Sequence, residues 1–217
     1  MTDKEGVIQY QLDFTASPPP DFEQINELNA WRRILYLLHL IGQDPGRYEG
    51  FGFGNISCRY QVKEKQKNTP EFIITGSQTG HLPFLENEHY AIVTEFEPLH
   101  NKISATGVIK PSSEALTHGA VYQANTDISA VFHAHSPEIW NHAERLGISA
   151  TNKHVSYGTP AMAEEIKKLM SKPAVIDTRI LIMAGHTDGV ITFGNTAQEA
   201  GNTLVDYYSR ALQIKNH

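Results

Sequence analysis

The chain has 217 residues, and its 18 lysines and arginines against 24 aspartates and glutamates give a formal net charge of -6 at pH 7. That length fits a single domain, and about 70% of the unfolded surface can be buried at this size, so folding needs no disulfide or structural metal. The lack of a basic excess argues against nucleic acid as a partner. The single cysteine, Cys58, excludes an internal disulfide and a cysteine-rich zinc site, so a metal would be held by histidine, carboxylate or water.

Neither a secretion signal nor a membrane span is visible. The first residues lack the basic segment and apolar core of a signal peptide. The longest strongly apolar stretch, residues 34–41, is interrupted by His39 and is far shorter than the roughly 20 residues that cross a bilayer. We therefore expect a soluble, cytoplasmic globular protein without a membrane partner.

The first part of the chain is expected to be an arm followed by a helix. Residues 1–20 end in a serine and three prolines, which predicts an extended N-terminal arm. A single domain then occupies residues 21–217. Apolar residues at three- and four-residue steps predict a helix between residues 21 and 41, and the five glycines of residues 42–54 predict a long turn after it.

Strands and helices alternate through the rest of the chain. The predicted strands are residues 56–62, 72–75, 91–96, 128–135 and 190–193. The predicted helices are residues 113–123, one opened by Pro137, one capped by Thr159, and a last one capped by Asn195 with Gln198 in capping-box register. These elements predict a three-layer α/β or α+β domain.

The sharpest local pattern is His133-Ala134-His135, at the end of a predicted strand. Alternate side chains of a strand point to one face, so the two histidines would lie about 7 Å apart at ~3.3 Å per residue. They could converge on one Zn²⁺, with a third ligand from elsewhere. The alternative is two polar residues on a half-exposed strand. A strand-to-helix turn at Ser136-Pro137 favours the metal interpretation, because open α/β sheets bind ligands at such turns.

Glu114 begins a predicted helix, four residues before His118 on the same face. A carboxylate in the first turn is explained either by catalysis or by its favourable interaction with the helix dipole. For His118 we expect packing within the core. Ser112 and Ser113 are suited either to capping this helix or to binding an anion at its N-terminus.

Two glycine-bearing loops, residues 52–57 and 75–80, lie beside predicted strands. Their N–H and hydroxyl groups could wrap a phosphate. Neither loop has the spacing of a Walker A or dinucleotide-binding motif, and each alone would be a turn.

Together these motifs resemble the class II aldolase/adducin family, and the Pro-Ser-Ser-Glu and His-x-His motifs are most similar to those of its fuculose-phosphate aldolases. The matching segments cover roughly residues 25–212 in the family's order. They are Gly54-Asn55-Ile56-Ser57-Cys58-Arg59, Ile74-Thr75 to Thr79-Gly80, Pro111-Ser112-Ser113-Glu114 with His118 and Tyr122, Val131 to Ser136, Tyr157-Gly158-Thr159, and Ala184-Gly185-His186.

The resemblance implies an α/β fold with a mostly antiparallel central sheet flanked by helices, and makes residues 21–217 a catalytic domain. It implies a homotetramer with sites near the subunit interfaces, and one Zn²⁺ or another divalent metal ion per subunit. The implied metal ligands are His133, His135 and His186. Glu114 would be the general acid/base and could also bind the metal when substrate is absent. The residues implied to hold a substrate phosphate are Gly54, Asn55, Thr79, Gly80, Ser112 and Ser113.

The chain departs from the family pattern at the third histidine. The family usually has Asn-His-Gly, whereas here His186 follows Gly185 and is separated from Gly189 by two residues. Asp188 and His154 are therefore alternative third ligands. A counterpart of the family's catalytic tyrosine is not assigned: Tyr157 matches only the Tyr-Gly-Thr start of a helix, and Tyr207 and Tyr208 near the C-terminus are the other tyrosines considered.

The expected function is a zinc-dependent lyase that cleaves a small phosphorylated keto-sugar by a reversible aldol reaction. A Lewis acid would stabilise the enediolate left when the carbon–carbon bond breaks, and Glu114 would move the proton. The alternatives are a sugar-phosphate dehydratase or 4-epimerase of the same family, or a non-catalytic adducin-like binding module.

Overall fold

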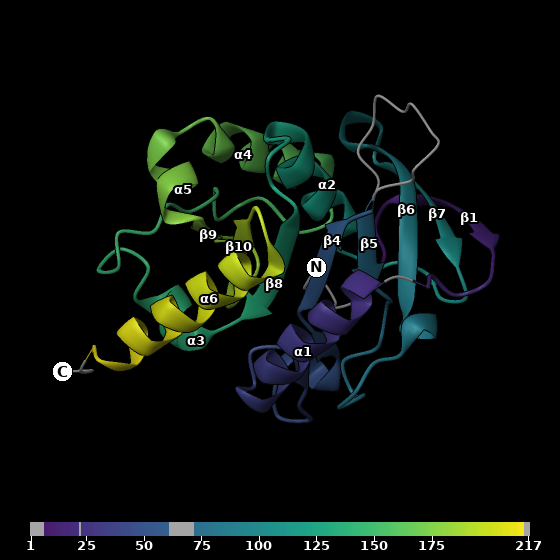
Figure 1. Cartoon of the computed structure of the whole chain (residues 1–217). Coiled ribbons are helices and arrows are strands. Elements are labelled where there is room, and N and C mark those ends of the chain that lie inside the picture. Colours follow the sequence, from purple (N-terminus) through teal and green to yellow (C-terminus); the bar gives the residue numbers. More distant parts are fainter. Residues whose placement is uncertain (1–6, 22, 61–71, 215–217) are drawn as a thin grey trace.

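The computed structural model describes residues 7–21, 23–60 and 72–214 (Figure 1). Its centre is an eight-stranded sheet with the strand order β1-β7-β6-β5-β4-β8-β10-β9. The strands of this sheet are β1 Gln11–Ala16, β4 Asn55–Arg59, β5 Phe72–Thr75, β6 Tyr90–Glu97, β7 Lys102–Gly107, β8 Ala130–His135, β9 Ile180–Ile182 and β10 Gly189–Gly194. A separate pair consists of β2 Gly42–Gln43 and β3 Gly52–Phe53. Residues 61–62, predicted to end a strand, lie outside the described residues.

The sheet is mixed, and a parallel pair corrects the expected strand arrangement, which was mostly antiparallel. β1 runs parallel to β7, whereas the other neighbouring strands run antiparallel. The parallel strand β1 lies in the segment that was expected to be an extended arm. This segment forms a strand because its apolar residues Leu12 and Phe14 alternate with polar ones and pack against the core. Tyr10, just before this strand, is buried, and its hydroxyl donates a 2.8 Å hydrogen bond to the carbonyl oxygen of Ser112.

Helices cover both faces of the sheet (Figure 1). The helices on one face are α1 Glu23–Leu37, α3 Pro137–Asn141 and α6 Ala197–Leu212, and those on the other are α2 Ala115–Ala124, α4 Pro160–Met170 and α5 Pro173–Thr178. Short 3₁₀ turns are η1 Tyr48–Gly50, η2 Asn87–His89 and η3 Pro98–His100. Side chains of β5 alternate between the two cores: Phe72 and Ile74 pack on the α2 side, and Ile73 packs on the α1 side. Because both faces are covered, every residue of β5, β8 and β10 is buried.

Local chemistry explains where several helices begin. The hydroxyl of Thr159 accepts a hydrogen bond from the first turn of α4, so the predicted cap of that helix is confirmed. The predicted cap of the last helix is wrong by one residue. Thr196, rather than Asn195, caps α6 by accepting a 3.1 Å hydrogen bond from the N–H of Glu199. The first helix ends at Leu37, four residues earlier than predicted.

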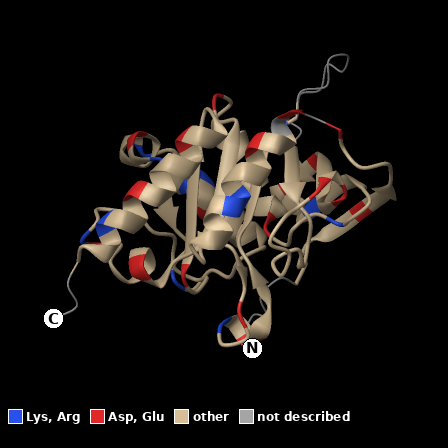
Figure 2. Ribbon diagram, turned by 60° about the horizontal axis from the view of Figure 1, so that its bottom comes forward, with Lys and Arg blue, Asp and Glu red and all other residues tan. Residues whose placement is uncertain are grey.

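The outer surface carries charges of both signs. Figure 2 shows acidic and basic residues interspersed over the helices of the described chain. Within the same residues, no helix has the length and apolar character required to cross a bilayer.

Candidate functional site

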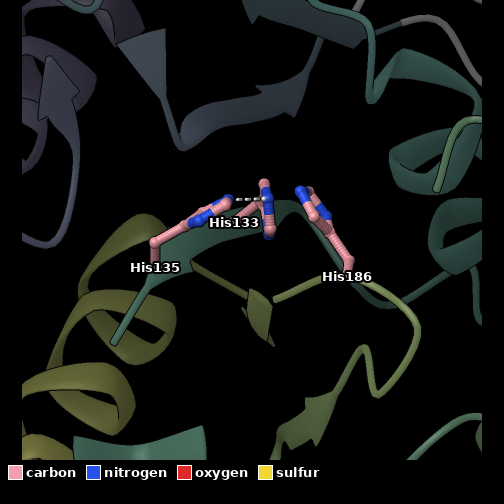
Figure 3. Close-up of side chains that lie close together, drawn as sticks. All are labelled: His133, His135 and His186. Atoms are coloured by element: carbon pink, nitrogen blue, oxygen red, sulfur yellow. Dashed lines mark hydrogen bonds between the residues drawn. The ribbon is translucent and has the colours of Figure 1, made fainter. Parts of the chain in front are cut away.

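Three buried histidines from two parts of the fold point toward one another (Figure 3). His133 and His135 lie on β8, and His186 lies in the turn between β9 and β10. One ring nitrogen of each histidine lies within 4.8 Å of the others, and the ring centroids are 4.7 to 5.1 Å apart. Three imidazoles in this arrangement can hold one metal ion and leave a coordination position open.

A hydrogen bond to the neighbouring strand orients the imidazole of His133, and the imidazole of His135 lies against it. Nδ1 of His133 lies 3.2 Å from the carbonyl oxygen of Val190, so its N–H donates there and Nε2 faces the cluster. Nε2 of His135 lies 3.1 Å from Nε2 of His133. Burial, aided by the neighbouring imidazoles, lowers the pKa of both rings well below 6.5. Neutral rings keep the lone pairs that bind a metal, so the donor set fits a divalent cation such as Zn²⁺.

His186 joins the cluster from a tight turn. Its ring stacks on Tyr157, with centroids 4.5 Å apart and an interplanar angle of 22°, and its Nδ1 lies 3.4 Å from Oε1 of Glu114. Neither alternative ligand belongs to the cluster. His154 is exposed, and the carboxylate of Asp188 accepts a 2.6 Å hydrogen bond from a tyrosine. Among the described residues, the group suited to hold a metal therefore consists of the three histidines alone.

The residue before His186 explains why the chain departs from the Asn-His-Gly pattern. A Cβ atom added to Gly185 would lie 2.0 Å from the carbonyl oxygen of Val155 and 2.8 Å from its carbonyl carbon. Both atoms belong to the backbone, so an asparagine would have to displace the segment that ends near Tyr157. Glycine here allows the close approach of two chain segments.

Glu114 faces His186 from the start of α2. It occupies the N-cap position but does not cap the helix through its side chain, which is 1% exposed. His118, one turn later, is fully buried, as expected, and its Nδ1 lies 2.7 Å from Oγ of Ser57. Burial lowers the pKa of His118 to about 3. The site therefore contains one buried carboxylate beside the histidines, whereas His118 bonds to Ser57 on β4 and is not part of the cluster.

A small polar hollow contains all six residues predicted to hold a phosphate. Its lining residues are Gly52, Gly54, Asn55, Gly76, Ser77, Gln78, Thr79, Gly80, Ser112 and Ser113. The hollow depends on glycine, because a Cβ atom on Gly80 would lie 2.4 Å from the carbonyl oxygen of Gly42 and 2.7 Å from Cα of Gly52. Backbone N–H and hydroxyl donors of this kind can hold an anion without a basic surface.

Arg32 supports the wall of this hollow and was not found from the sequence. Its side chain is 2% exposed, and it donates hydrogen bonds to the carbonyl oxygens of Thr79 at 3.1 Å, Gly80 at 3.3 Å and Leu82. Burial lowers its pKa to about 10. The guanidinium thus fixes the loop of residues 79–82 from behind.

Tyr48 is a second residue that sequence reasoning missed. Its ring meets the ring of His135 edge-on, with centroids 4.6 Å apart. Of the three tyrosines considered from the sequence, Tyr157 reaches the histidines, whereas Tyr207 and Tyr208 lie on α6.

A larger hollow of about 450 Å³ lies between α2, α4 and η3, away from all three histidines of the cluster.

Comparisons with known proteins assign the chain to a family. Residues 46–214 match the family described as the Class II Aldolase and Adducin N-terminal domain, and the chain belongs to this family. A comparison with curated proteins gives no match.

Solved structures share the fold at low sequence identity. An L-fuculose 1-phosphate aldolase is 20% identical, with a TM-score of 0.63, and the match covers 89% of this chain and 84% of that one. A sugar-phosphate aldolase from Thermotoga maritima is 15% identical, with a TM-score of 0.63 and coverage of 88% and 92%. YgbL from Escherichia coli, a putative aldolase/epimerase/decarboxylase, is 18% identical, with a TM-score of 0.61 and coverage of 87% and 86%.

Proposed function

We propose that this protein is a zinc-dependent lyase that cleaves a small phosphorylated keto-sugar by a reversible aldol reaction. The observation that carries the proposal is the buried cluster of His133, His135 and His186, with Glu114 at its edge. When bound there, Zn²⁺ or another divalent ion would supply a Lewis acid for the charge that develops beside the substrate carbonyl.

The chain's own groups suit the other parts of such a reaction. Glu114 would take a proton from the substrate or return it through its carboxylate, whose Oε1 lies 3.4 Å from Nδ1 of His186. The polar hollow beside β4 and α2 would bind the phosphate through neutral donors. The proposed phosphate-binding residues are Gly54, Asn55, Thr79, Gly80, Ser112 and Ser113. Burial of Glu114 and the histidines would keep water away from the reacting groups.

A dehydratase or a 4-epimerase stays an alternative, because either reaction would pass through the same enediolate or its equivalent, and the printed name of YgbL joins several reaction classes. A non-catalytic binding module is the alternative of another class. The retained cluster of three histidines and a carboxylate favours chemistry over binding alone. A homotetramer, implied by the family resemblance, stays a prediction that light scattering tests.

Metal analysis of the purified protein tests the ligand set. We expect about one Zn²⁺ per chain in the wild type, and its loss in both His133→Ala and His186→Ala. His154→Ala, which alters an exposed histidine outside the cluster, is the matched control and should keep the metal. Retention of zinc in His186→Ala with loss in His154→Ala would contradict the assignment.

Product analysis then separates the reactions. Phosphorylated ketoses are incubated with the zinc-loaded protein, and release of an aldehyde, loss of water and epimerised product are each measured. Aldehyde release that disappears in Glu114→Gln supports the aldolase. Equal turnover of unphosphorylated sugars would contradict the phosphate-binding role of the hollow.

A further inference from the structure

Tyr48 links two segments that carry histidines of the cluster. Its hydroxyl donates a 2.6 Å hydrogen bond to Oδ2 of Asp188, and its ring packs edge-on against His135 at an interplanar angle of 72°. Tyr48 and Glu49 both adopt left-handed backbone conformations, with φ angles of 48° and 55°. Bulky residues rarely adopt this conformation, and such residues cluster at functional sites.

Arg47 holds the same hydroxyl from the other side. A guanidinium N–H donates to Oη of Tyr48 at 2.6 Å, and another donates to the carbonyl oxygen of His39 at 3.2 Å. The guanidinium also lies over the ring of Phe53, 4.6 Å from its centroid. The hydroxyl of Tyr48 therefore accepts from a cation and donates to a carboxylate, an arrangement that strengthens both hydrogen bonds.

Asp188 connects Tyr48 to the turn that carries His186 and to the end of β8, the strand that carries the other two histidines. It lies two residues after His186 in the turn between β9 and β10, with a left-handed φ angle of 62°. Its carbonyl oxygen accepts a 2.9 Å hydrogen bond from the N–H of Ser136, the residue that follows His135. Asp188 thus bonds to Tyr48 through its side chain and to the end of β8 through its backbone.

We propose that Arg47, Tyr48 and Asp188 form a positioning clamp that holds the ring of His135 and the turn of His186 at the spacing needed to share one metal ion. The clamp contacts a proposed ligand on one side and the turn that carries a second ligand on the other. Partners that orient metal ligands set metal affinity by restricting the ligand geometry. This inference rests on the proposed metal site, and it adds residues that the family motifs do not contain.

Metal titration of chelator-treated protein tests the clamp. Tyr48→Phe keeps the ring and removes the hydroxyl, and Asp188→Asn keeps the shape and removes the charge. We expect each variant to bind Zn²⁺ about 10–100-fold more weakly than the wild type. The double variant should be about as weak as the weaker single variant, because both changes break the same link. The absorption bands of bound Co²⁺ should also shift in each variant, because the ligand geometry relaxes.

Tyr90→Phe is the matched control. It removes a 2.7 Å hydrogen bond between a buried tyrosine hydroxyl and Oδ1 of Asn29, between β6 and α1. We expect it to lower the stability of the metal-free protein without changing metal affinity or the Co²⁺ spectrum. Wild-type affinity and spectrum in Tyr48→Phe and Asp188→Asn would overturn the clamp and leave the proposed function intact. A wild type that binds no divalent metal would overturn both.

Discussion

Acid should destabilise the metal-free protein through His118, and the structure gives the size of the effect. The ring is fully buried against Ser57, and burial lowers its pKa in the folded chain to about 3, whereas an unfolded histidine titrates near 6.5. Above pH 6.5 the ring is neutral in both states. Below it, the unfolded chain binds a proton that the folded chain does not, so stability is lost as the pH falls from 6.5 toward 3. One pKa unit corresponds to about 1.36 kcal/mol, so His118 alone costs about 2 kcal/mol at pH 5.

Urea unfolding of chelator-treated protein at pH 7.5 and pH 5.0 measures this cost. We expect the loss of unfolding free energy between the two pH values to be about 2 kcal/mol smaller in His118→Gln than in the wild type. His154→Gln removes an exposed histidine and should behave as the wild type. If His118→Gln and the wild type lose the same free energy on acidification, buried neutral His118 does not cause acid sensitivity.

Three substitutions test the close contacts around the site. Gly185→Asn should lower the thermal midpoint and weaken zinc binding at least about tenfold, because its Cβ would lie 2.0 Å from a backbone oxygen; calorimetry and metal titration measure both, and unchanged values would refute the contact. Gly80→Ala should lower the free energy of unfolding in urea by about 1–3 kcal/mol. It should also weaken the inhibition of the proposed aldol cleavage by inorganic phosphate. Arg32→Met should cost about 1–3 kcal/mol or more, since it leaves carbonyl oxygens of the 79–82 loop without their buried donor; a fully stable variant would show that these bonds contribute nothing net.

The sequence predicts those parts of the site that lie on regular elements. The two-residue period of a strand is enough to bring His133 and His135 together, and Glu114 follows from the start of a helix. The third histidine could not be derived from spacing, because the turn geometry that brings His186 across from β9 depends on a backbone approach at Gly185. Family resemblance, rather than periodicity, indicated that residue.

Tyr48 shows the limit more sharply. It lies in the glycine-rich stretch predicted to be a long turn, where no periodic pattern exists. A left-handed backbone at a tyrosine opposes its local preference, so tertiary contacts rather than local sequence determine it. Arg32 was predicted only as part of a helix, because a buried cation held by carbonyl oxygens leaves no motif. β1 was missed for another reason, since its alternation of apolar Leu12 and Phe14 was visible but adjoined a proline run.

The supports of the polar hollow extend beyond the segment that defines the family. The family match covers residues 46–214, and every proposed site residue lies inside it. Arg32, which fixes the 79–82 loop, and Tyr10, whose hydroxyl bonds to the carbonyl of Ser112, both precede it. A fragment trimmed to the matched residues would keep every proposed site residue. It would lose the two side chains, Arg32 and Tyr10, whose hydrogen bonds hold the backbone around the hollow. For this chain, the unit that is recognised by sequence is smaller than the unit that holds the site in shape.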